Sequence, residues 1–275
     1  FWGVLAWIVP CIVVMSAIRG CVGFGSWFYK PEFGMSSFEI LSRGSGIVAY
    51  CNKNTYVLSC LHISHPFKYP QYYDPKDEDK AWVHKVHEEE IKFALRISDE
   101  QGNAADTVDL SRTHVYRHPV RDLVAFKFKD AVDGENFIDK HNLQVFDSFR
   151  TPQNNERLLL SGHRCVSQNV DNKDVSLEIP QTVEGEVLGV AKVSQLGQLG
   201  EKINLEQGLA HAATTLEMGM CGAPVFQPET RECKGMVEAI MAHGPEAGRL
   251  AVFIPGKHIE EFLESIDSGE NASQL

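Results

Sequence analysis

Three short segments of the chain carry side chains whose chemistry is complementary. The run YVLSCLHI puts His62 directly after an apolar stretch, RDLVAFKF puts Asp122 at the start of another, and GMCGAPVF puts Cys221 between glycines in a predicted turn. A thiol is a poor nucleophile until it loses its proton, and an imidazole both accepts that proton and stabilises the thiolate. A carboxylate can fix the tautomer and orientation of the imidazole. These residue types therefore suit nucleophilic attack on an acyl carbon.

The turn around Cys221 also offers hydrogen-bond donors. Acyl transfer places a negative charge on a carbonyl oxygen, and two inward-facing backbone N–H groups stabilise that charge. In a Gly-x-Cys turn the N–H groups of Gly219 and Cys221 are available, because Gly219 can adopt a backbone geometry that other residues resist. Pro224 then fixes the exit into the next strand.

Each of these residues also has an ordinary structural interpretation. His62 fits a buried core histidine, and Asp122 fits an acid at the start of a strand, paired with the adjoining Arg121. Cys221 fits an inert buried thiol, which is the commonest fate of a free cysteine. The sequence leaves these interpretations open beside the chemical one.

The order of the three segments resembles that of the trypsin-like serine and cysteine peptidases, especially their HtrA-like branch. In that family one strand ends in a His, a second begins with an Asp, and a G-x-S/C-G-G-P turn carries the nucleophile. The downstream runs KGMVEAIMA and GRLAVFIPGKHIEEFL also resemble the family's last strands and C-terminal helix, so the resemblance covers roughly residues 44–267. It implies a catalytic triad of His62, Asp122 and Cys221 and an oxyanion hole formed by Gly219 and Cys221. The implied fold is all-β, with two six-stranded antiparallel barrels and a C-terminal helix.

Three positions depart from the family pattern. Met220 stands where secreted trypsins have an aspartate that pairs with a freed N-terminus, so that activation switch is absent. Ala223 replaces the second glycine of the turn, and Cys60 stands two residues before His62, where a small residue is usual. These changes are compatible with an active or an inactive protein.

The resemblance also places two residues in a specificity pocket. Thr215 falls at the base of the primary pocket by family position, and His243 could line the other wall or lie exposed in a loop. A threonine offers no charge to pair with Lys or Arg, so the pocket is expected to prefer a neutral or small polar side chain.

The rest of the chain predicts a β-rich domain. Short strand-like runs alternate with turn signals, which is typical of an antiparallel barrel or sandwich. The runs are 46–50, 55–61, 91–97, 114–118, 122–128, 157–162, 185–193, 223–227, 235–242 and 249–254. Only 257–267 has clear helical spacing of apolar residues, and 64–90 reads as a polar insertion between two strands.

Composition excludes several classes of protein. The 275 residues carry a formal net charge of −11, which argues against nucleic-acid binding. Seven cysteines without a CxxC pair predict neither a disulfide framework nor a zinc ribbon. The pairs His84/His87 and His114/His118 lack companion ligands at metal spacing, so no metal and no cofactor is expected.

The chain opens with 18 uncharged residues, FWGVLAWIVPCIVVMSAI. As a helix they would extend roughly 27 Å, close to the hydrocarbon thickness of a bilayer. We therefore expect a transmembrane helix at 1–19 in contact with membrane lipid, a linker at 20–43, the domain at 44–267 and a polar tail at 268–275. A secretory signal peptide is the main alternative. The membrane, organellar (mitochondrial or plastid) or endomembrane, stays open.

Two functions follow from these observations. The first is a membrane-anchored cysteine endopeptidase that cleaves peptide or protein substrates through Cys221, His62 and Asp122. The alternative is a catalytically inactive protease-fold subunit with a structural or binding role among the protein subunits of a membrane complex, because a fold does not secure a function.

Overall fold

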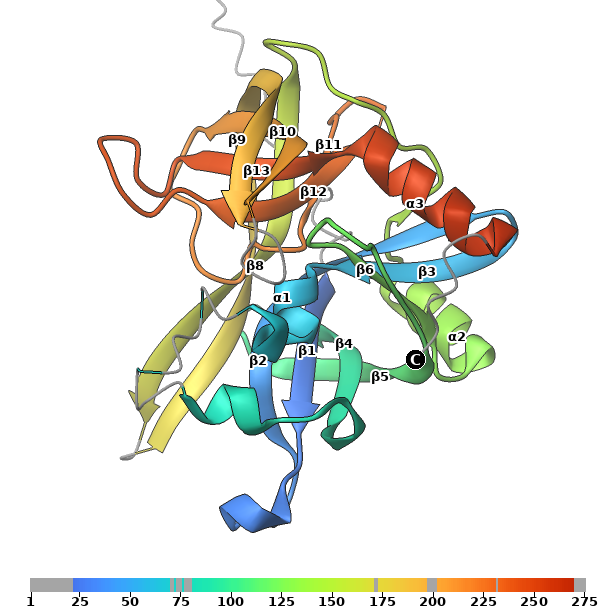
Figure 1. Ribbon diagram of the computed structural model, residues 1–275, viewed down its shortest axis with the longest axis vertical. Helices are drawn as coiled ribbons and strands as arrows, with labels where there is room; N and C mark the ends of the chain where they lie inside the picture. The colour runs from blue at the N-terminus through green and yellow to red at the C-terminus, as the bar shows by residue number, and fades with distance from the viewer. Residues whose placement is uncertain are drawn as a thin grey trace, which may run out of the picture.

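The computed structural model describes residues 22–69, 72, 76, 81–170, 173–196, 202–230 and 232–269. Its strands fall into an N-terminal and a C-terminal half, which are coloured blue to green and yellow to red in Figure 1. The predicted transmembrane helix at 1–19 and most of the polar tail lie outside the described residues. Among the helices that the structure does describe, none has the length and apolar character needed to cross a membrane.

The N-terminal half is a sheet with the strand order β1-β4-β5-β6-β3-β2-β7. Its strands are β1 (Val22–Phe28), β2 (Glu39–Cys51), β3 (Asn54–Ser59), β4 (Ile91–Ser98), β5 (Ala104–Arg117), β6 (Val124–Phe128) and β7 (Val145–Phe146). All pair antiparallel except β7, which pairs parallel with β2, and β1 also pairs with β2. That extra ladder joins the two sides of the sheet, so its apolar side chains, among them Phe24, Leu58, Leu95 and Phe126, pack together inside.

The C-terminal half is a closed barrel with the order β10-β13-β12-β11-β8-β9. Its strands are β8 (Arg157–Val170), β9 (Lys173–Leu196), β10 (Lys202–Ala212), β11 (Pro224–Phe226), β12 (Cys233–Ile240) and β13 (Leu250–Pro255). Leu160, Val187, Val225 and Phe253 fill its interior. The all-β fold class and one six-stranded barrel are thus as the sequence predicts.

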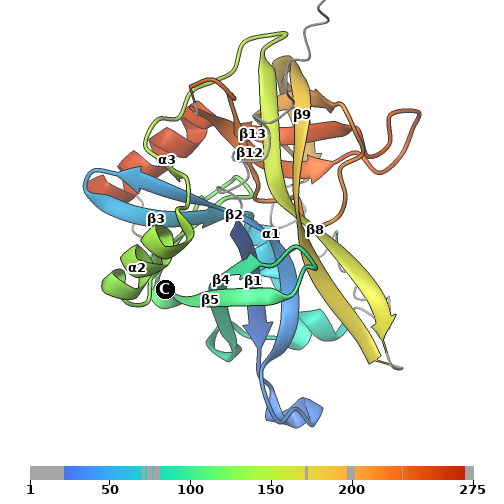
Figure 2. The same cartoon turned by 180° about the vertical axis from the view of Figure 1, so that it is seen from behind.

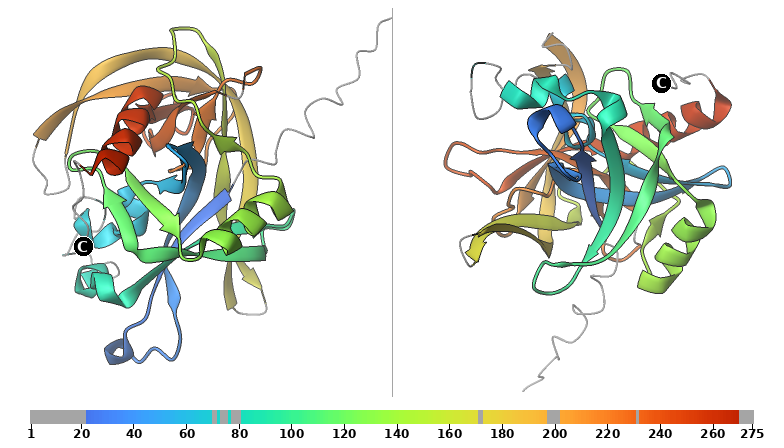
Figure 3. Two further views of the ribbon diagram at one scale, coloured as in Figure 1. Left: turned by 90° about the vertical axis from the view of Figure 1, so that its right-hand side faces the viewer. Right: turned by 90° about the horizontal axis from the view of Figure 1, so that it is seen from below.

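Helices connect and cover these sheets. They are α1 (Leu61–Ser64), α2 (Ala131–His141) and α3 (Gly256–Ser268), with short 3-10 turns at Pro31–Phe33, Pro66–Lys68, Ala81–Lys85 and Glu88–Glu90. Helix α3 follows the last barrel strand, yet its apolar face joins the N-terminal core, and Asp267 near its end accepts hydrogen bonds from Tyr56 at 2.5 Å and Asn54 at 3.1 Å. It therefore ties the two halves together; the left view in Figure 3 shows α3 from the side.

The β8–β9 hairpin is long enough to extend past its own barrel and along the N-terminal sheet, which is clearest from behind (Figure 2). There Glu178 of β9 is 1% exposed and accepts from Arg96 at 2.5 Å and Arg43 at 3.5 Å. Burial raises the pKa of Glu178, and the two arginines oppose that rise. This ion pair fastens the hairpin to strands β2 and β4.

Removing the charge of Glu178 should destabilise the fold. Glu178→Gln leaves two largely buried guanidinium groups without an anion, which costs about 3 kcal/mol. Urea unfolding at pH 7 measures this loss. The exposed pair of Arg157 and Glu184 provides the control, because Arg157→Ala should change the unfolding free energy by less than about 0.5 kcal/mol. Equal effects of the two substitutions would contradict the prediction.

The structure contains elements that the sequence analysis did not predict, and three of them change the picture of the domain most. The expected linker at 20–43 contains β1, which pairs with β2 and β4 and is buried along most of its length. Helix α2 and strand β10 were not predicted. Since β1 is part of the sheet, the folded domain begins at Val22 at the latest, rather than at residue 44.

Candidate active site

His62 and Asp122 meet at the end of the N-terminal sheet nearest the barrel. Strand β3 ends at Ser59, and the single turn α1, which lies between the two halves in Figure 1, carries His62. Asp122 lies two residues before β6, which pairs with β3, and its side chain is 6% exposed. One of its carboxylate oxygens accepts the backbone N–H of His62 at 2.8 Å, and the other bonds to ring Nδ1. Asp122 thus orients both the backbone and the ring of His62.

Cys221 approaches His62 from the C-terminal half. It lies in the turn before β11, is partly buried, and is close enough to the His62 ring to favour the charged form of the imidazole. Burial opposes the charged form of the His62 ring, but Asp122 and Cys221 outweigh it and raise the pKa of His62 well above its ordinary value. The structure therefore brings His62 and Asp122 into contact. Cys221 lies in the adjoining turn, and its part in a triad stays a prediction.

The alternative role for Asp122, pairing with Arg121, is not what the structure shows. The Arg121 guanidinium is buried and donates to the backbone carbonyl of Glu206 on β10 at 2.9 Å. Burial lowers the pKa of Arg121, and the Glu238 carboxylate opposes that shift most strongly among the nearby acids. Arg121 therefore connects the two halves and leaves Asp122 to His62.

The turn before Cys221 is fixed by hydrogen bonds to its carbonyl groups. The carbonyl of Met218 accepts from the N–H of Cys165 at 2.7 Å, and that of Met220 accepts from Ala223 at 3.0 Å. A trans peptide points its N–H and C=O in opposite directions. The N–H groups of Gly219 and Cys221 therefore point away from these contacts, and within the described residues neither donates to a protein oxygen.

Backbone geometry explains the glycines on both sides of Cys221. Gly219 has φ +104° and Gly222 has φ +87°, a region that L side chains rarely adopt. A Cβ on Gly219 would lie 2.7 Å from the carbonyl oxygen of His163, and one on Gly222 would lie 2.1 Å from that of Ser45. These two positions require glycine.

The polar insertion contributes aromatic rings beside His62. The ring of Tyr69 lies 5.9 Å and that of Tyr72 lies 5.3 Å from the imidazole, both edge-on, and the two tyrosines stack on each other. Tyr69 is buried, whereas Tyr72 is half-exposed. The sequence analysis did not identify these residues as part of the site, since their approach depends on how the insertion folds back.

The predicted specificity residues lie farther out. Thr215 is exposed; its carbonyl accepts from Gln181 at 3.1 Å, and its methyl group lies against Gly248. His243 is exposed between β12 and β13. Within the described part of the chain neither contacts the triad, so their role in a substrate pocket stays a prediction.

Only one group of three metal-ligating side chains occurs in the described ranges. The ligand atoms of Cys60, His62 and Asp122 lie within 4.8 Å of one another. His62 and Asp122 already bond to each other there, and the buried Cys60 thiol lies near the carbonyl of Val237 at 3.3 Å. The cluster thus overlaps the triad and does not by itself indicate a cofactor.

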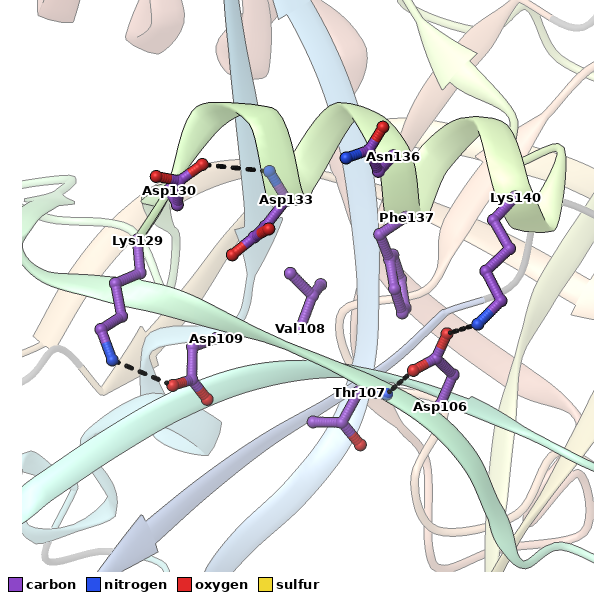
Figure 4. Close-up of a pocket in the computed structure, with 10 residues that line it drawn as sticks. All are labelled: Asp106, Thr107, Val108, Asp109, Lys129, Asp130, Asp133, Asn136, Phe137 and Lys140. Carbon is purple, nitrogen blue, oxygen red and sulfur yellow. Dashed lines mark hydrogen bonds and ion pairs between the residues drawn. The ribbon is translucent and has the colours of Figure 1, made fainter.

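A pocket of about 610 Å³ lies between α2 and β5, and none of the triad residues line it (Figure 4). Its charges are mostly compensated within the protein. Lys140 lies 2.8 Å from Asp106, Lys129 lies 3.3 Å from Asp109, and Asp130 caps the N-terminus of α2. This pocket is therefore not the candidate active site.

His163, on β8 beside the turn that carries Cys221, should make the free energy of unfolding depend on pH below about 6.5. Its ring is buried, and burial together with Arg96 lowers its pKa to about 4, although a backbone hydrogen bond with Val22 opposes the shift. The unfolded chain takes up this proton near pH 6.5, so between roughly pH 6.5 and 4 the unfolded state binds more protons and stability falls as pH falls. His163→Gln should reduce that loss by about 3 kcal/mol in urea titrations across this window. If the unfolding free energy of His163→Gln changed with pH as steeply as that of the wild type, the prediction would be wrong.

The closed barrel, the second sheet, the C-terminal helix and a Cys-His-Asp group at the junction define a trypsin-like protease fold. Among solved structures, the chain is similar to the Rv3671c protease of M. tuberculosis. The active form aligns with a TM-score of 0.55 and 10% identity over 96% of this chain and 85% of that one, and the inactive form with 0.54 and 11% over 92% of each. The HtrA-type protease AlgW, with a tripeptide, aligns with 0.51 and 14% over 92% of this chain and 62% of that one. No family model and no curated protein matches the chain.

Proposed function

We propose that the protein is a cysteine endopeptidase that uses Cys221 as nucleophile, His62 as general base and acid, and Asp122 to orient the imidazole. The observation that carries this proposal is the arrangement of His62, whose backbone N–H and Nδ1 are both bound by Asp122. Cys221 is the thiol of the neighbouring turn, and together with Asp122 it raises the pKa of His62 against the effect of burial.

The first half of the reaction forms an acyl-enzyme. The Cys221 thiol gives its proton to His62, and the sulfur attacks the carbonyl carbon of the scissile bond. The resulting oxyanion accepts from the N–H groups of Gly219 and Cys221. When the C–N bond breaks, His62 returns its proton to the leaving amine, and a thioester remains on Cys221.

The second half hydrolyses the thioester. His62 takes a proton from a water molecule, whose oxygen attacks the acyl carbon, and a second oxyanion forms in the same place. The C–S bond then breaks, a carboxylic acid leaves, and Cys221 regains its proton from His62. The chemistry needs no cofactor. If Thr215 forms the base of the primary pocket, the substrate residue at the cleavage position is a neutral or small polar one.

The test is the alkylation rate of Cys221 by iodoacetamide at pH 7 in the full chain, solubilised in detergent. The labelled cysteine is identified by mass spectrometry of the peptides. Cys51 serves as an internal reference, because burial first, and then Asp267, raise its pKa to about 11. An imidazole-activated thiol at Cys221 should react at least about tenfold faster than Cys51 and should lose that advantage in His62→Ala.

Slow labelling of Cys221 that does not change in His62→Ala would overturn the endopeptidase proposal. It would favour the catalytically inactive subunit, for which the half-exposed Tyr72 beside His62 would be part of a binding surface. Cleavage of a peptide substrate by the wild type, and not by Cys221→Ser, would complete the case for an enzyme.

We also propose that residues 1–19 anchor the protein in a membrane as a single pass. The support is the uncharged run of the sequence. Extraction of membranes with alkaline carbonate tests it: an anchored chain stays in the pellet, whereas a chain that starts at residue 20 is released. Release of both chains would overturn the proposal.

A further inference from the structure

Ser45, in the middle of the Gly44-Ser45-Gly46 segment of β2, makes an unusual set of contacts with the nucleophile turn. It is completely buried. Its backbone N–H donates to the carbonyl of Cys221 at 2.8 Å, and its hydroxyl donates to the carbonyl of Gly219, also at 2.8 Å. One residue of the N-terminal half thus binds two carbonyl groups of a turn that belongs to the C-terminal half.

The direction of the hydroxyl proton is determined by a third contact. The backbone N–H of His163 donates to Ser45 Oγ at 2.9 Å. Since an N–H can only donate, the oxygen is the acceptor there, and its own proton is directed to Gly219. The Ser45 carbonyl in turn accepts from the hydroxyl of Ser59 at 2.9 Å. The N–H, the hydroxyl and the carbonyl of Ser45 are thus all hydrogen-bonded.

These contacts act on the peptides that directly follow the two oxyanion donors. The carbonyl of Gly219 follows directly after its N–H, and the carbonyl of Cys221 follows directly after the second donor. The neighbouring carbonyls of Met218 and Met220 accept hydrogen bonds from Cys165 and Ala223. The carbonyl oxygens of residues 218 to 221 are therefore all hydrogen-bonded. Of these anchors, only Ser45 comes from the half that carries His62 and Asp122.

We propose, on the basis of the function proposed above, that Ser45 is a positioning residue: its hydroxyl sets the Gly219 and Cys221 N–H groups at the correct place relative to His62. The site is built for a small hydroxyl side chain. A Cβ on Gly162 would lie 2.6 Å from Ser45 Oγ, so that glycine leaves the room that the hydroxyl occupies. Ser45 does not touch the reacting atoms and acts through the turn.

The experiment compares Ser45→Ala with the wild type in three assays of the full chain. The first is turnover of a peptide thioester, the second is inhibition by a peptide aldehyde, and the third is iodoacetamide alkylation of Cys221. The aldehyde adds the sulfur to its carbonyl carbon and gives a hemithioacetal whose oxygen occupies the oxyanion position. In alkylation the sulfur displaces iodide from a saturated carbon, so no oxyanion forms.

Ser45→Ala should lower kcat about 10- to 100-fold with KM within about threefold, less than the loss of a whole oxyanion donor. The inhibition constant of the aldehyde should rise by a similar factor, while the alkylation rate stays within about twofold. The matched control is Ser161→Ala, which removes another buried hydroxyl, bonded to Thr182 at 2.8 Å, without a contact to the turn.

Two results would overturn the role of Ser45. One is a kcat and an aldehyde affinity within about twofold of those of Ser161→Ala. The other is a proportional loss in all three assays, which indicates a general structural defect. Failure of the proposed function gives a different result, namely slow alkylation of Cys221 in the wild type itself, insensitive to His62→Ala, and it overturns both proposals together.

Discussion

Replacing Asp122 by Asn should lower kcat by about two to four orders of magnitude and leave KM nearly unchanged. Both oxygens of Asp122 engage His62, one at the backbone N–H and one at Nδ1. The amide oxygen of Asn can keep the first contact, and its NH₂ group then faces Nδ1. This forces the imidazole proton onto Nε2, towards Cys221, where the ring can no longer accept a proton.

The same substitution should change how stability depends on pH. Asp122 raises the pKa of His62 against the opposing effect of burial. A raised pKa means that the paired imidazolium contributes stability fully below about pH 6.5, where the unfolded His is also charged, and loses it as pH rises through the native pKa. Asp122→Asn should therefore lower the free energy of unfolding, and this loss should be larger at pH 5.5 than at high pH.

Steady-state kinetics on a peptide thioester and urea unfolding at several pH values measure these two effects. Asp106→Asn is a suitable control, since Asp106 binds His141 at 2.7 Å and Lys140 on the far side of the N-terminal half. It should affect stability and leave kcat within about twofold. A kcat loss of less than fivefold in Asp122→Asn would show that Asp122 does not orient the catalytic imidazole.

The resemblance of three short segments to trypsin-like peptidases predicted the site, and the contact of His62 with Asp122 is where the structure agrees with it. Each of the three residues lies at the border of a strand whose apolar run is recognisable in the sequence. The strands themselves follow from short apolar runs between turn signals, and β3, β4, β6 and β13 lie close to their predicted positions. At these strands the apolar run and the turn residues that flank it both indicate the same element, so its position can be predicted from the sequence.

Strand β1 and helix α2 show where such patterns fail. The run VGFGSWF has glycines at two of seven positions, which reads as a connection, yet the Gly25 position is filled by the ring of Trp27. In α2 the glycine at 134 breaks the helical pattern of the sequence. Packing against strand β6 requires a glycine there, because a Cβ would lie 2.4 Å from the Phe128 ring. In both cases the packing of a bulky ring takes the place of a side chain at the glycine, and β1 becomes a strand because it pairs with β2 and β4.

The supports of the site could not be predicted for the same reason. Ser45 lies 174 residues before the Gly219 carbonyl that it binds, and no periodicity connects the two positions. Tyr69 and Tyr72 lie in an insertion with charges and prolines that reads as solvated, and they reach His62 only because the chain folds back over α1. A sequence can thus identify the reacting groups more easily than the groups that hold them.

Gly219→Ala should have the second-largest effect, a kcat loss of about 100-fold or more. The native φ of +104° costs an alanine about 1 to 3 kcal/mol, and its Cβ would meet the His163 carbonyl oxygen at 2.7 Å and Cys165 Sγ at 2.8 Å. Both the strain and the contact are relieved when the backbone rotates, which turns the Gly219 N–H away from the oxyanion. Loss of one such donor costs about 10²- to 10³-fold in kcat.

Gly34 provides the control that separates backbone strain from the loss of the donor. Its φ is +76°, and nothing lies within 4 Å of an added Cβ, so Gly34→Ala has a comparable conformational cost without a collision. It should lower the thermal midpoint slightly and leave kcat unchanged. In Gly219→Ala the iodoacetamide rate of Cys221 should persist while kcat and the affinity for a peptide aldehyde fall, because only the last two need the donor. If Gly219→Ala retained the kcat of Gly34→Ala, the N–H of Gly219 would not be part of an oxyanion hole, and the chemistry assigned to this turn would have to be revised.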